Sequence, residues 1–452
     1  MTDVSKMFHS SRSTVSGVNL LNWRDYQKRL QGVARRRYLS HKMQVVSLYF
    51  VLVIISYTGS WLFAQLWLAH DRPLKNRERK NSRPEKLVKQ DLPGLLEGLD
   101  LSLNPVKQHY LLEKNGTKLR IETSLDTALQ GYILKLLHRS RTFKTAVVVL
   151  RPNTGQILAM ASYDKNGTGG KENLCLQANY PAASLFKIVS AAAAIEACGF
   201  TPDRPAVFRG RKHTLYRSQL NPGIGRYSRK TSFRKAFSGS INPVFGIIGI
   251  HDLGRQSMTE YANKFFFNQA IRFDLPVTMS RIRIPKDDFG LAEIASGFNK
   301  KTLISPLHAS LITAAIANRG TMLEPWLVRR IKDESGGVSY RARRSRLARP
   351  IKEETAELLK TLMAHTVLHG TCRSAFRPLR RKRVFQGIEL GAKTGTINDD
   401  LDQHKYDWIT AYALANGGDR GICISVLAIH EEKLGLRAND LARYIINYYY
   451  TS

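Results

Sequence analysis

Residues 181–198 read PAASLFKIVSAAAAIEAC, and this alanine-rich stretch predicts a helix that starts at Ser184 and runs to Cys198. Ser184 then lies at the positive end of the helix dipole, and Lys187 follows one turn later on the same face. A lysine that is partly desolvated beside another cation can lose its proton near neutral pH and accept a serine proton. The spacing therefore suits a serine nucleophile with a lysine base.

The same Ser-x-x-Lys spacing recurs at Ser232 and Lys235, where it carries no such prediction. Neighbouring cations crowd that pair and no apolar face accompanies it, so a serine helix cap with a surface lysine is the simpler interpretation. Most isolated Ser-x-x-Lys pairs have this ordinary explanation. At Ser184 the apolar helix and two further motifs favour a catalytic role for the serine.

The two further motifs are Ser240-Ile241-Asn242 and Lys393-Thr394-Gly395-Thr396. The first is weak alone, since Ser102 and Asn104 repeat its pattern. The second ends an apolar run that predicts a strand, so a lysine and two hydroxyls would project from an exposed edge and could bind a carboxylate. The backbone N–H of Thr396, opposite that of Ser184, could then complete an oxyanion hole.

Apolar runs predict strands at both ends of the folded region. Residues 144–150 and 156–162 flank an Asn-Thr-Gly turn and indicate a hairpin. Three more runs, 390–396, 408–414 and 421–429, suit adjacent strands, and a last helix is expected over 438–449. Strands first, helices in the middle and strands last imply one sheet assembled from both ends, with a helical lobe inserted between them.

The N-terminal quarter of the chain has a different composition. Residues 43–69 contain no charge and are long enough to span a bilayer, so we expect a single uncleaved transmembrane anchor. Residues 1–42 would form a short basic cytoplasmic tail. Residues 70–118 are charged and punctuated by four prolines, and we expect a stalk with little folded structure. The catalytic domain would then occupy residues 119–452. Basic residues crowd both flanks of the anchor, so charge does not decide its orientation.

The formal net charge of +34 indicates an anionic neighbourhood, which nucleic acid, lipid headgroups or a cell-wall polymer could supply. The sequence has no zinc-finger spacing and no RNA-binding aromatic signature, so we expect no nucleic-acid partner. Basic runs at 341–349 and 377–383 are most simply solvated loops. The four cysteines form no Cys-x-x-Cys pair, which argues against a metal site. The sequence does not decide whether Cys175 and Cys198 form a disulfide.

The three motifs in this order resemble the signature of penicillin-binding proteins and serine β-lactamases. The chain is similar to the transpeptidase domain of the former over nearly all of residues 119–452. Further similar stretches lie at 120–126, 147–162, 304–308, 317–320 and 408–412. Two departures are His308, where glutamine is usual, and Phe298, near a site that often holds a glutamine-glycine pair.

The resemblance implies an α/β (α+β) fold, with an antiparallel five-stranded sheet flanked by helices and an inserted all-helical lobe. It also implies that Ser184 attacks a D-alanyl-D-alanine stem peptide, with Lys187 as base and Ser240 as proton relay. Asn242 would hold the acyl chain. The substrate carboxylate would be held by a group that comprises Lys393, Thr394, Gly395 and Thr396. No metal or cofactor is implied.

The partners implied are peptidoglycan stem peptides or their lipid-linked precursor, and β-lactams. Since that substrate exists only outside the cytoplasmic membrane, we expect a bacterial inner-membrane protein with a periplasmic catalytic domain. The chain leaves too little room for a glycosyltransferase domain, so transpeptidation without glycan polymerisation is expected.

Three alternatives remain. A β-lactam-hydrolysing or sensing relative would share Ser184, Lys187 and Lys393, but no Glu-x-x-Leu-Asn sequence lies between Asn242 and Lys393. A non-catalytic envelope scaffold would normally have lost a catalytic residue. A D,D-carboxypeptidase is not distinguishable from a transpeptidase by these motifs.

Overall fold

The computed structural model describes residues 43, 46–49, 51–60, 86–97, 99, 101, 103–114, 116–167, 173–223, 225, 227–415, 420–432 and 434–452. The chain divides into two units, Met1–Ser82 and Arg83–Ser452. In the first unit, residues 51–60 form a helix with exposed side chains. No helix among the described residues is long and apolar enough to cross a membrane. The predicted tail 1–42 and residues 61–69 of the predicted anchor lie outside those residues.

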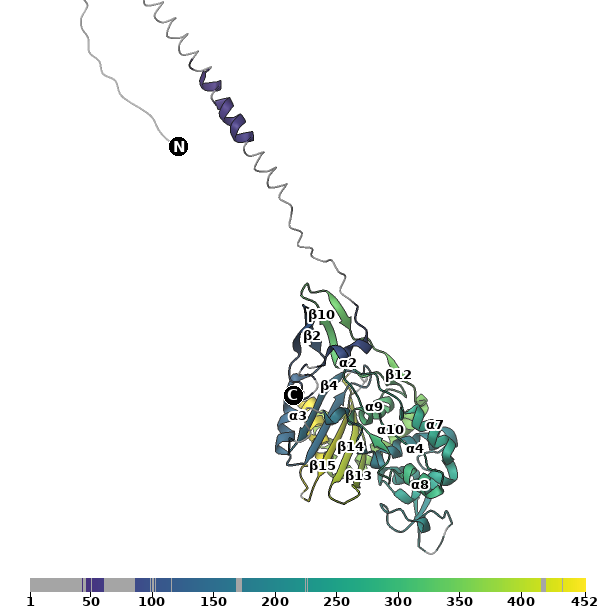
Figure 1. The fold of residues 1–452 in the computed structure, drawn as a ribbon. Coiled ribbons are helices and arrows are strands. Elements are labelled where there is room, and N and C mark those ends of the chain that lie inside the picture. The colour runs from purple at the N-terminus through teal and green to yellow at the C-terminus, as the bar shows by residue number, and fades with distance from the viewer. Residues whose placement is uncertain are drawn as a thin grey trace, which may run out of the picture. The chain divides into compact units, whose positions relative to one another are not determined.

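An antiparallel five-stranded sheet organises the second unit (Figure 1). Its order is β13-β14-β15-β3-β4, so strands from the end of the chain pair with strands from the start of the domain, and all five predicted strands are confirmed. The bounds are β3 (Lys144–Leu150), β4 (Ile157–Asp164), β13 (Glu389–Asn398), β14 (Lys405–Leu414) and β15 (Ile422–His430).

Both faces of this sheet are buried, because successive side chains of a strand point to opposite sides. Val147 and Val149 face a cluster with helices α3 (Thr127–Arg139), α11 (Arg373–Arg380) and α12 (Ala438–Thr451). Ala146 and Val148 face the larger core, which contains α4 (Lys187–Cys198), α9 (Pro306–Ala317) and α10 (Glu353–Leu368). Two-sided burial explains why the strands read as continuous apolar runs in the sequence.

The insertion between β4 and β13 is mainly helical, as predicted, but it is not purely helical. Its other helices are α5 (Phe233–Ser238), α6 (Asn242–Ile247), α7 (Gly254–Lys264) and α8 (Asp288–Ser296), with a π-helical turn at Ile248–Leu253. Short strand pairs interrupt them: β5 (Tyr180–Pro181) with β8 (Leu303–Ile304), β6 (Pro205–Arg209) with β7 (Ser228–Ser232), and β9 (Met322–Leu323) with β12 (Arg346–Ala348).

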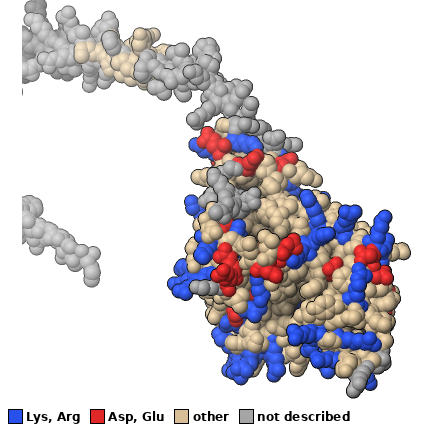
Figure 2. All heavy atoms as spheres, turned by 60° about the horizontal axis from the view of Figure 1, so that its bottom comes forward, with Lys and Arg blue, Asp and Glu red and all other residues tan. Residues whose placement is uncertain are grey.

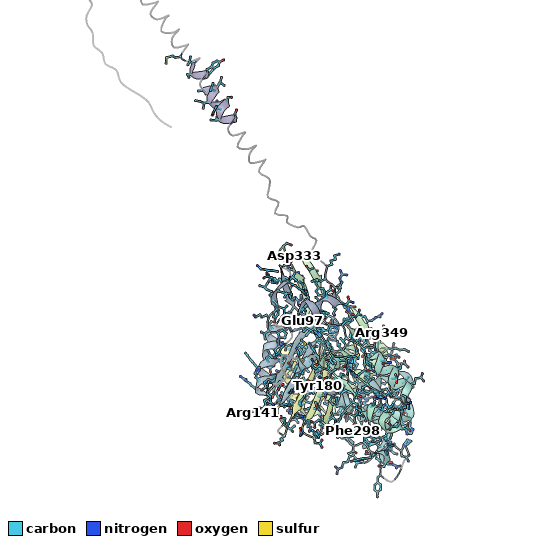
Figure 3. All side chains as sticks on the ribbon, in the orientation of Figure 1. Glu97, Arg141, Tyr180, Phe298, Asp333 and Arg349 are labelled. Carbon is cyan, nitrogen blue, oxygen red and sulfur yellow. The ribbon has the colours of Figure 1, made fainter. Side chains whose placement is uncertain are left out.

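A second sheet, ordered β1-β2-β10-β11, comprises β1 (His109–Lys114), β2 (Thr117–Thr123), β10 (Val328–Lys332) and β11 (Val338–Arg341). Asp333, in the turn after β10, and Phe298 lie toward opposite ends of the second unit (Figure 3). Lys and Arg side chains are spread widely over the face in Figure 2, with the acidic side chains in smaller groups.

The expectation of a stalk with little folded structure over 70–118 is wrong for the described residues between 86 and 118. A 3-10 turn at Lys89–Asp91 leads into α2 (Leu92–Leu95), and β1 follows. Leu92 and Leu101 are fully buried in the larger core. Prolines and charges suggested a tether, but Pro93 occupies the first turn of α2, where the missing N–H costs no hydrogen bond. The second unit therefore includes this segment.

Replacing Leu92 with alanine in the full-length protein should lower the free energy of unfolding by about 2–5 kcal/mol, because it leaves a cavity in the core. Leu111→Ala is the matched control, since Leu111 is 78% exposed. Urea denaturation followed by tryptophan fluorescence measures both. Equal, small effects of the two substitutions would show that residues 86–101 do not fold with the domain.

Candidate active site

Ser184 is held at the start of the predicted helix by a tight backbone arrangement. A 3-10 turn at Ala183–Phe186 replaces the first turn of the predicted helix, and α4 continues from Lys187. Ala183 has a left-handed backbone, with φ of 48°. Gly297 (φ 64°) packs against the Ala183 carbonyl, where a Cβ would collide. A Cβ at Gly395 would lie 3.2 Å from the Ser184 nitrogen, so β13 passes directly beside the serine backbone.

Lys187 is fully buried and joins Ser184 to two other segments of the helical insertion. Its Nζ lies 3.0 Å from Ser184 Oγ and 2.7 Å from Asn242 Oδ1, and it also contacts the Ser296 carbonyl oxygen. Burial, reinforced by the charge of Lys393, holds the pKa of Lys187 well below its usual range. The lowered pKa favours the neutral amine, which is the form that can accept a proton from Ser184.

Lys393, the first residue of the third motif, is also fully buried. Its Nζ donates hydrogen bonds to Ser240 Oγ at 3.2 Å and to the Thr394 carbonyl at 2.7 Å. Burial lowers the pKa of Lys393 to about 7. Ser240 has a left-handed backbone, with φ of 53°. Both motif lysines thus contact a motif serine through Nζ.

The hydroxyls of Thr394 and Thr396 line one wall of a cavity. Thr394 Oγ1 lies 2.6 Å from Thr371 Oγ1, and Thr396 Oγ1 donates to Asp407 Oδ1 at 3.4 Å. Thr396 also pairs with Asp407 in the register of β13 and β14. These contacts fix both threonine side chains beside Gly395.

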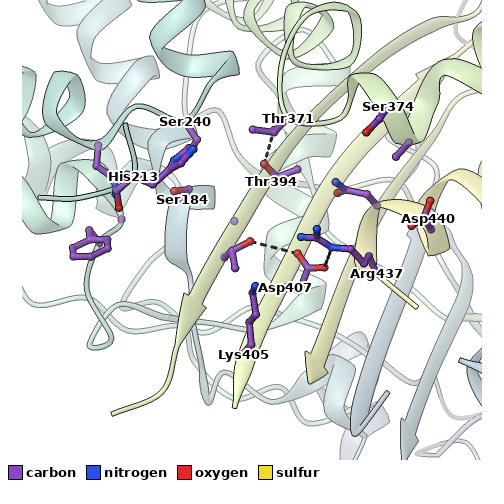
Figure 4. Close-up of a pocket in the computed structure, with 17 residues that line it drawn as sticks. Ser184, His213, Ser240, Thr371, Ser374, Thr394, Lys405, Asp407, Arg437 and Asp440 are labelled. Carbon is purple, nitrogen blue, oxygen red and sulfur yellow. Dashed lines mark hydrogen bonds and ion pairs between the residues drawn. The ribbon is translucent and has the colours of Figure 1, made fainter. Parts of the chain in front are cut away.

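The cavity has a volume of about 620 Å³ (Figure 4). Six of the eight predicted site residues line it: Ser184, Ser240, Asn242, Thr394, Gly395 and Thr396. The other two, Lys187 and Lys393, lie behind this lining. The serines, the asparagine and the threonines of the motifs therefore form part of the cavity wall, and both lysine side chains are buried behind it.

Sequence reasoning missed several residues of this site. Thr371 and His213 line the cavity, and Ser296 contributes a carbonyl oxygen to Lys187. Asn242 Nδ2 donates to the His213 carbonyl at 3.0 Å. Burial, followed by the charges of both motif lysines, lowers the pKa of His213. No local pattern marks these residues, because they reach the site only through the fold.

The other candidates have structural explanations. Ser232 caps α5 by accepting a hydrogen bond from the Lys235 nitrogen, as the simpler interpretation predicted. Of the competing Ser-x-Asn pair, Ser102 lies outside the described residues. His308 is buried against the Phe265 carbonyl, with Nε2 at 2.7 Å, and burial lowers its pKa to about 4. Phe298 is 40% exposed at the cavity.

The four cysteines are free, so Cys175 and Cys198 form no disulfide in this structure. Cys175 is buried against β3 and β4, where its thiol donates to the carbonyls of Val147 and Ala161. Among the described residues, no group of three or more His, Cys, Asp or Glu side chains could hold a metal ion.

Comparison with known proteins places this geometry in a family. The model of the penicillin binding protein transpeptidase domain matches residues 145–444. Stage V sporulation protein D of Bacillus subtilis is 24% identical over 307 residues, which are 65% of this chain and 46% of that protein. Peptidoglycan D,D-transpeptidase PbpA of Mycobacterium tuberculosis is 26% identical over 318 residues, covering 63% and 62% of the two chains. The chain thus spans about half to three fifths of these relatives.

Solved structures share the fold. Penicillin-binding protein A from Mycobacterium tuberculosis is 22% identical, with a TM-score of 0.60 over 74% of this chain and 82% of that one. The D,D-transpeptidase domain of a peptidoglycan glycosyltransferase from Eggerthella lenta is also 22% identical, with a TM-score of 0.59 over 72% and 82%. The chain belongs to the penicillin-binding protein transpeptidase domain family.

Proposed function

We propose that this chain is a peptidoglycan D,D-transpeptidase that forms a serine acyl-enzyme with D-alanyl-D-alanine stem peptides and is acylated by β-lactams. The observation that carries the proposal is the 3.0 Å contact between Ser184 Oγ, at the cavity wall, and a fully buried lysine amine. A nucleophile beside an amine whose pKa is lowered by burial is the arrangement that acyl transfer requires.

In the acylation step, Lys187 Nζ accepts the Ser184 proton as Oγ attacks the penultimate D-alanine carbonyl. The backbone N–H groups of Ser184 and Thr396 would stabilise the oxyanion, since β13 runs beside the serine backbone at Gly395. The Thr394 hydroxyl would hold the terminal carboxylate, and the Thr396 hydroxyl would join it by turning its single proton from Asp407 to the substrate. Lys393 lies behind them and adds positive charge without touching the cavity.

The leaving D-alanine amine needs a proton, which Ser240 would supply. Its Oγ lines the cavity and accepts a hydrogen bond from Lys393 Nζ. Asn242, whose Oδ1 accepts from Lys187 Nζ, would bind the retained acyl chain through the same cavity wall. An amine from a second stem peptide then attacks the ester carbonyl and gives its proton back to Ser240, while Ser184 Oγ leaves with the proton held by Lys187. Water in place of that amine would give the alternative activity, a D,D-carboxypeptidase.

The relatives support acyl transfer. The PbpA relative is named a peptidoglycan D,D-transpeptidase, and penicillin-binding protein A from Mycobacterium tuberculosis has been solved as imipenem and penicillin G acyl-enzyme complexes. We extend this to the chain as a bacterial inner-membrane protein, with residues 43–69 as a single-pass anchor and the catalytic domain outside. The uncharged run 43–69 supports that placement, and the lipid-linked precursor would then lie within reach.

Penicillin should attach once, at Ser184, because its strained amide and carboxylate occupy the place of the D-alanyl-D-alanine terminus. Intact-mass spectrometry should show one adduct on the natural protein and none on Ser184→Ala. Ser232→Ala is the control: it removes a helix cap worth about 1 kcal/mol but keeps labelling. An adduct on Ser184→Ala would remove the assignment of the nucleophile.

The rate of acylation well below saturation should first rise and then fall as the pH increases. Under this condition the pH dependence of the rate reports the pKa values of the free enzyme. The rate rises as Lys187 loses its proton. For a donor with a terminal carboxylate it falls again as Lys393 loses its charge, around pH 7. Lys393→Ala should remove the second limb. It should also move the first limb to higher pH, because the charge of Lys393 lowers the pKa of Lys187.

A thioester donor without a carboxylate is the control for this profile, since it should lack the second limb even in the natural protein. If Lys393→Ala keeps the fall in rate above pH 7 for the carboxylate donor, another group carries that limb. The separation between base and carboxylate recognition would then be wrong.

A further inference from the structure

The cavity continues past Ser184 and Thr394 to residues that belong to none of the three motifs. It reaches Asp407 on β14 and Arg437, Asn439 and Asp440 at the start of α12. In Figure 4, Ser184 and Arg437 lie on opposite sides of the strand that carries Thr394, with Asp440 beside Arg437. The volume around the serine therefore has a second, charged arm.

Arg437 is held in this arm by a buried carboxylate. Its Nε donates to Asp407 Oδ2 at 3.3 Å, and the Arg437 side chain is 48% exposed while that of Asp407 is only 3% exposed. Asp407 also accepts from the Ala438 nitrogen at 3.2 Å and from the Thr396 hydroxyl. The same acid therefore orients both Arg437 and a threonine of the third motif.

The guanidinium keeps its outer edge available. Its hydrogen bonds to described residues use Nε alone, so the two terminal amino groups can still donate. A planar guanidinium fork binds a carboxylate through two parallel hydrogen bonds, which a lysine cannot reproduce. Asp440, which also lines the arm, is half-buried and contacts Arg443 instead, with 3.5 Å between Oδ1 and the guanidinium.

One terminal carboxylate would be held at Thr394 and Thr396, so a second anion anchor in the same cavity calls for a second carboxylate on the ligand. We infer that Arg437 binds a carboxylate carried by the side chain of the acyl donor, on the residue that precedes the two D-alanines. The inference rests on the proposed function and names its substrate class: stem peptides whose third residue ends in a free acid. Lys405, which also lines the cavity, is the competing cation.

The test uses two acyl donors, N-acetyl-X-D-alanyl-D-alanine, in which X is 2-aminopimelic acid or its side-chain amide. The two donors have the same size and differ by one negative charge. A hydrogen-bonded charge pair that is half exposed and already shared with an acid should favour the acid donor about tenfold in acylation rate below saturation. In Arg437→Gln the ratio of the two rates should fall to about one.

Arg377→Gln is the matched control, because Arg377 is an exposed arginine on α11 outside the cavity and its loss changes net charge equally. It should keep the natural ratio. Arg437→Lys retains the charge beside Asp407 and should fold even if Arg437→Gln does not. It should still lose most of the preference for the acid donor, because a lysine cannot form two parallel hydrogen bonds to a carboxylate.

Equal rates for both donors in the natural protein would overturn the inference, as would a preference that survives Arg437→Gln or disappears in Lys405→Ala instead. A dependence on side-chain charge that appears only for the acceptor amine, with none in acylation, would also overturn it. Failure of the natural protein to be acylated at Ser184 by penicillin is a different result, which would count against the proposed function itself.

Discussion

Two lysine amines are buried beneath one cavity, and none of the acceptors that the described residues offer them is a carboxylate. Removing an ammonium group from water is costly unless it loses its proton or finds compensating partners. Here the partners are neutral oxygens from Ser184, Asn242 and Ser296 for Lys187, and from Ser240 and Thr394 for Lys393. These neutral oxygens accept hydrogen bonds from the amine but do not stabilise its positive charge as a carboxylate would. Both pKa values are lowered as a result.

The fold has to bring those oxygens together from distant parts of the chain. Ser184 precedes α4, Asn242 begins α6, Ser296 ends α8 and Thr394 lies on β13. The backbone is left-handed at Ala183, directly before Ser184, and at Ser240 itself. The serine that contacts each lysine therefore lies at or next to such a residue. Non-glycine residues in this region carry a cost of about 1–3 kcal/mol and persist only where the surrounding packing fixes them. Gly297 and Gly395 allow the close approach of backbone that does so.

The sequence predicted what is local or repetitive. The five strands of the main sheet, α4 and α12 follow from apolar runs, because a buried strand or helix leaves its own pattern in the sequence. Eight site residues followed from motif order and resemblance. The segment at Leu92 was misjudged because its burial depends on the rest of the core, which composition cannot show. Thr371, Ser296 and Arg437 carried no signal for the same reason, since each meets the site only through tertiary packing.

Asp407 and Lys187 are both buried at the cavity, but the charged form is favoured for the first and the neutral form for the second. Asp407 is almost as buried as Lys187, yet its pKa is lowered rather than raised. Burial alone would raise the pKa of this acid, but His430, the Arg437 guanidinium and the Ala438 nitrogen together outweigh the loss of water. The described residues that accept hydrogen bonds from Lys187 do so through neutral oxygens, and Lys393 adds a second cation, so burial favours the neutral amine. The wall with Lys187 therefore suits proton transfer, and the wall with Asp407 and Arg437 suits recognition of charge. Thr396 donates to Asp407 from the strand that passes Ser184, and so it links the two walls.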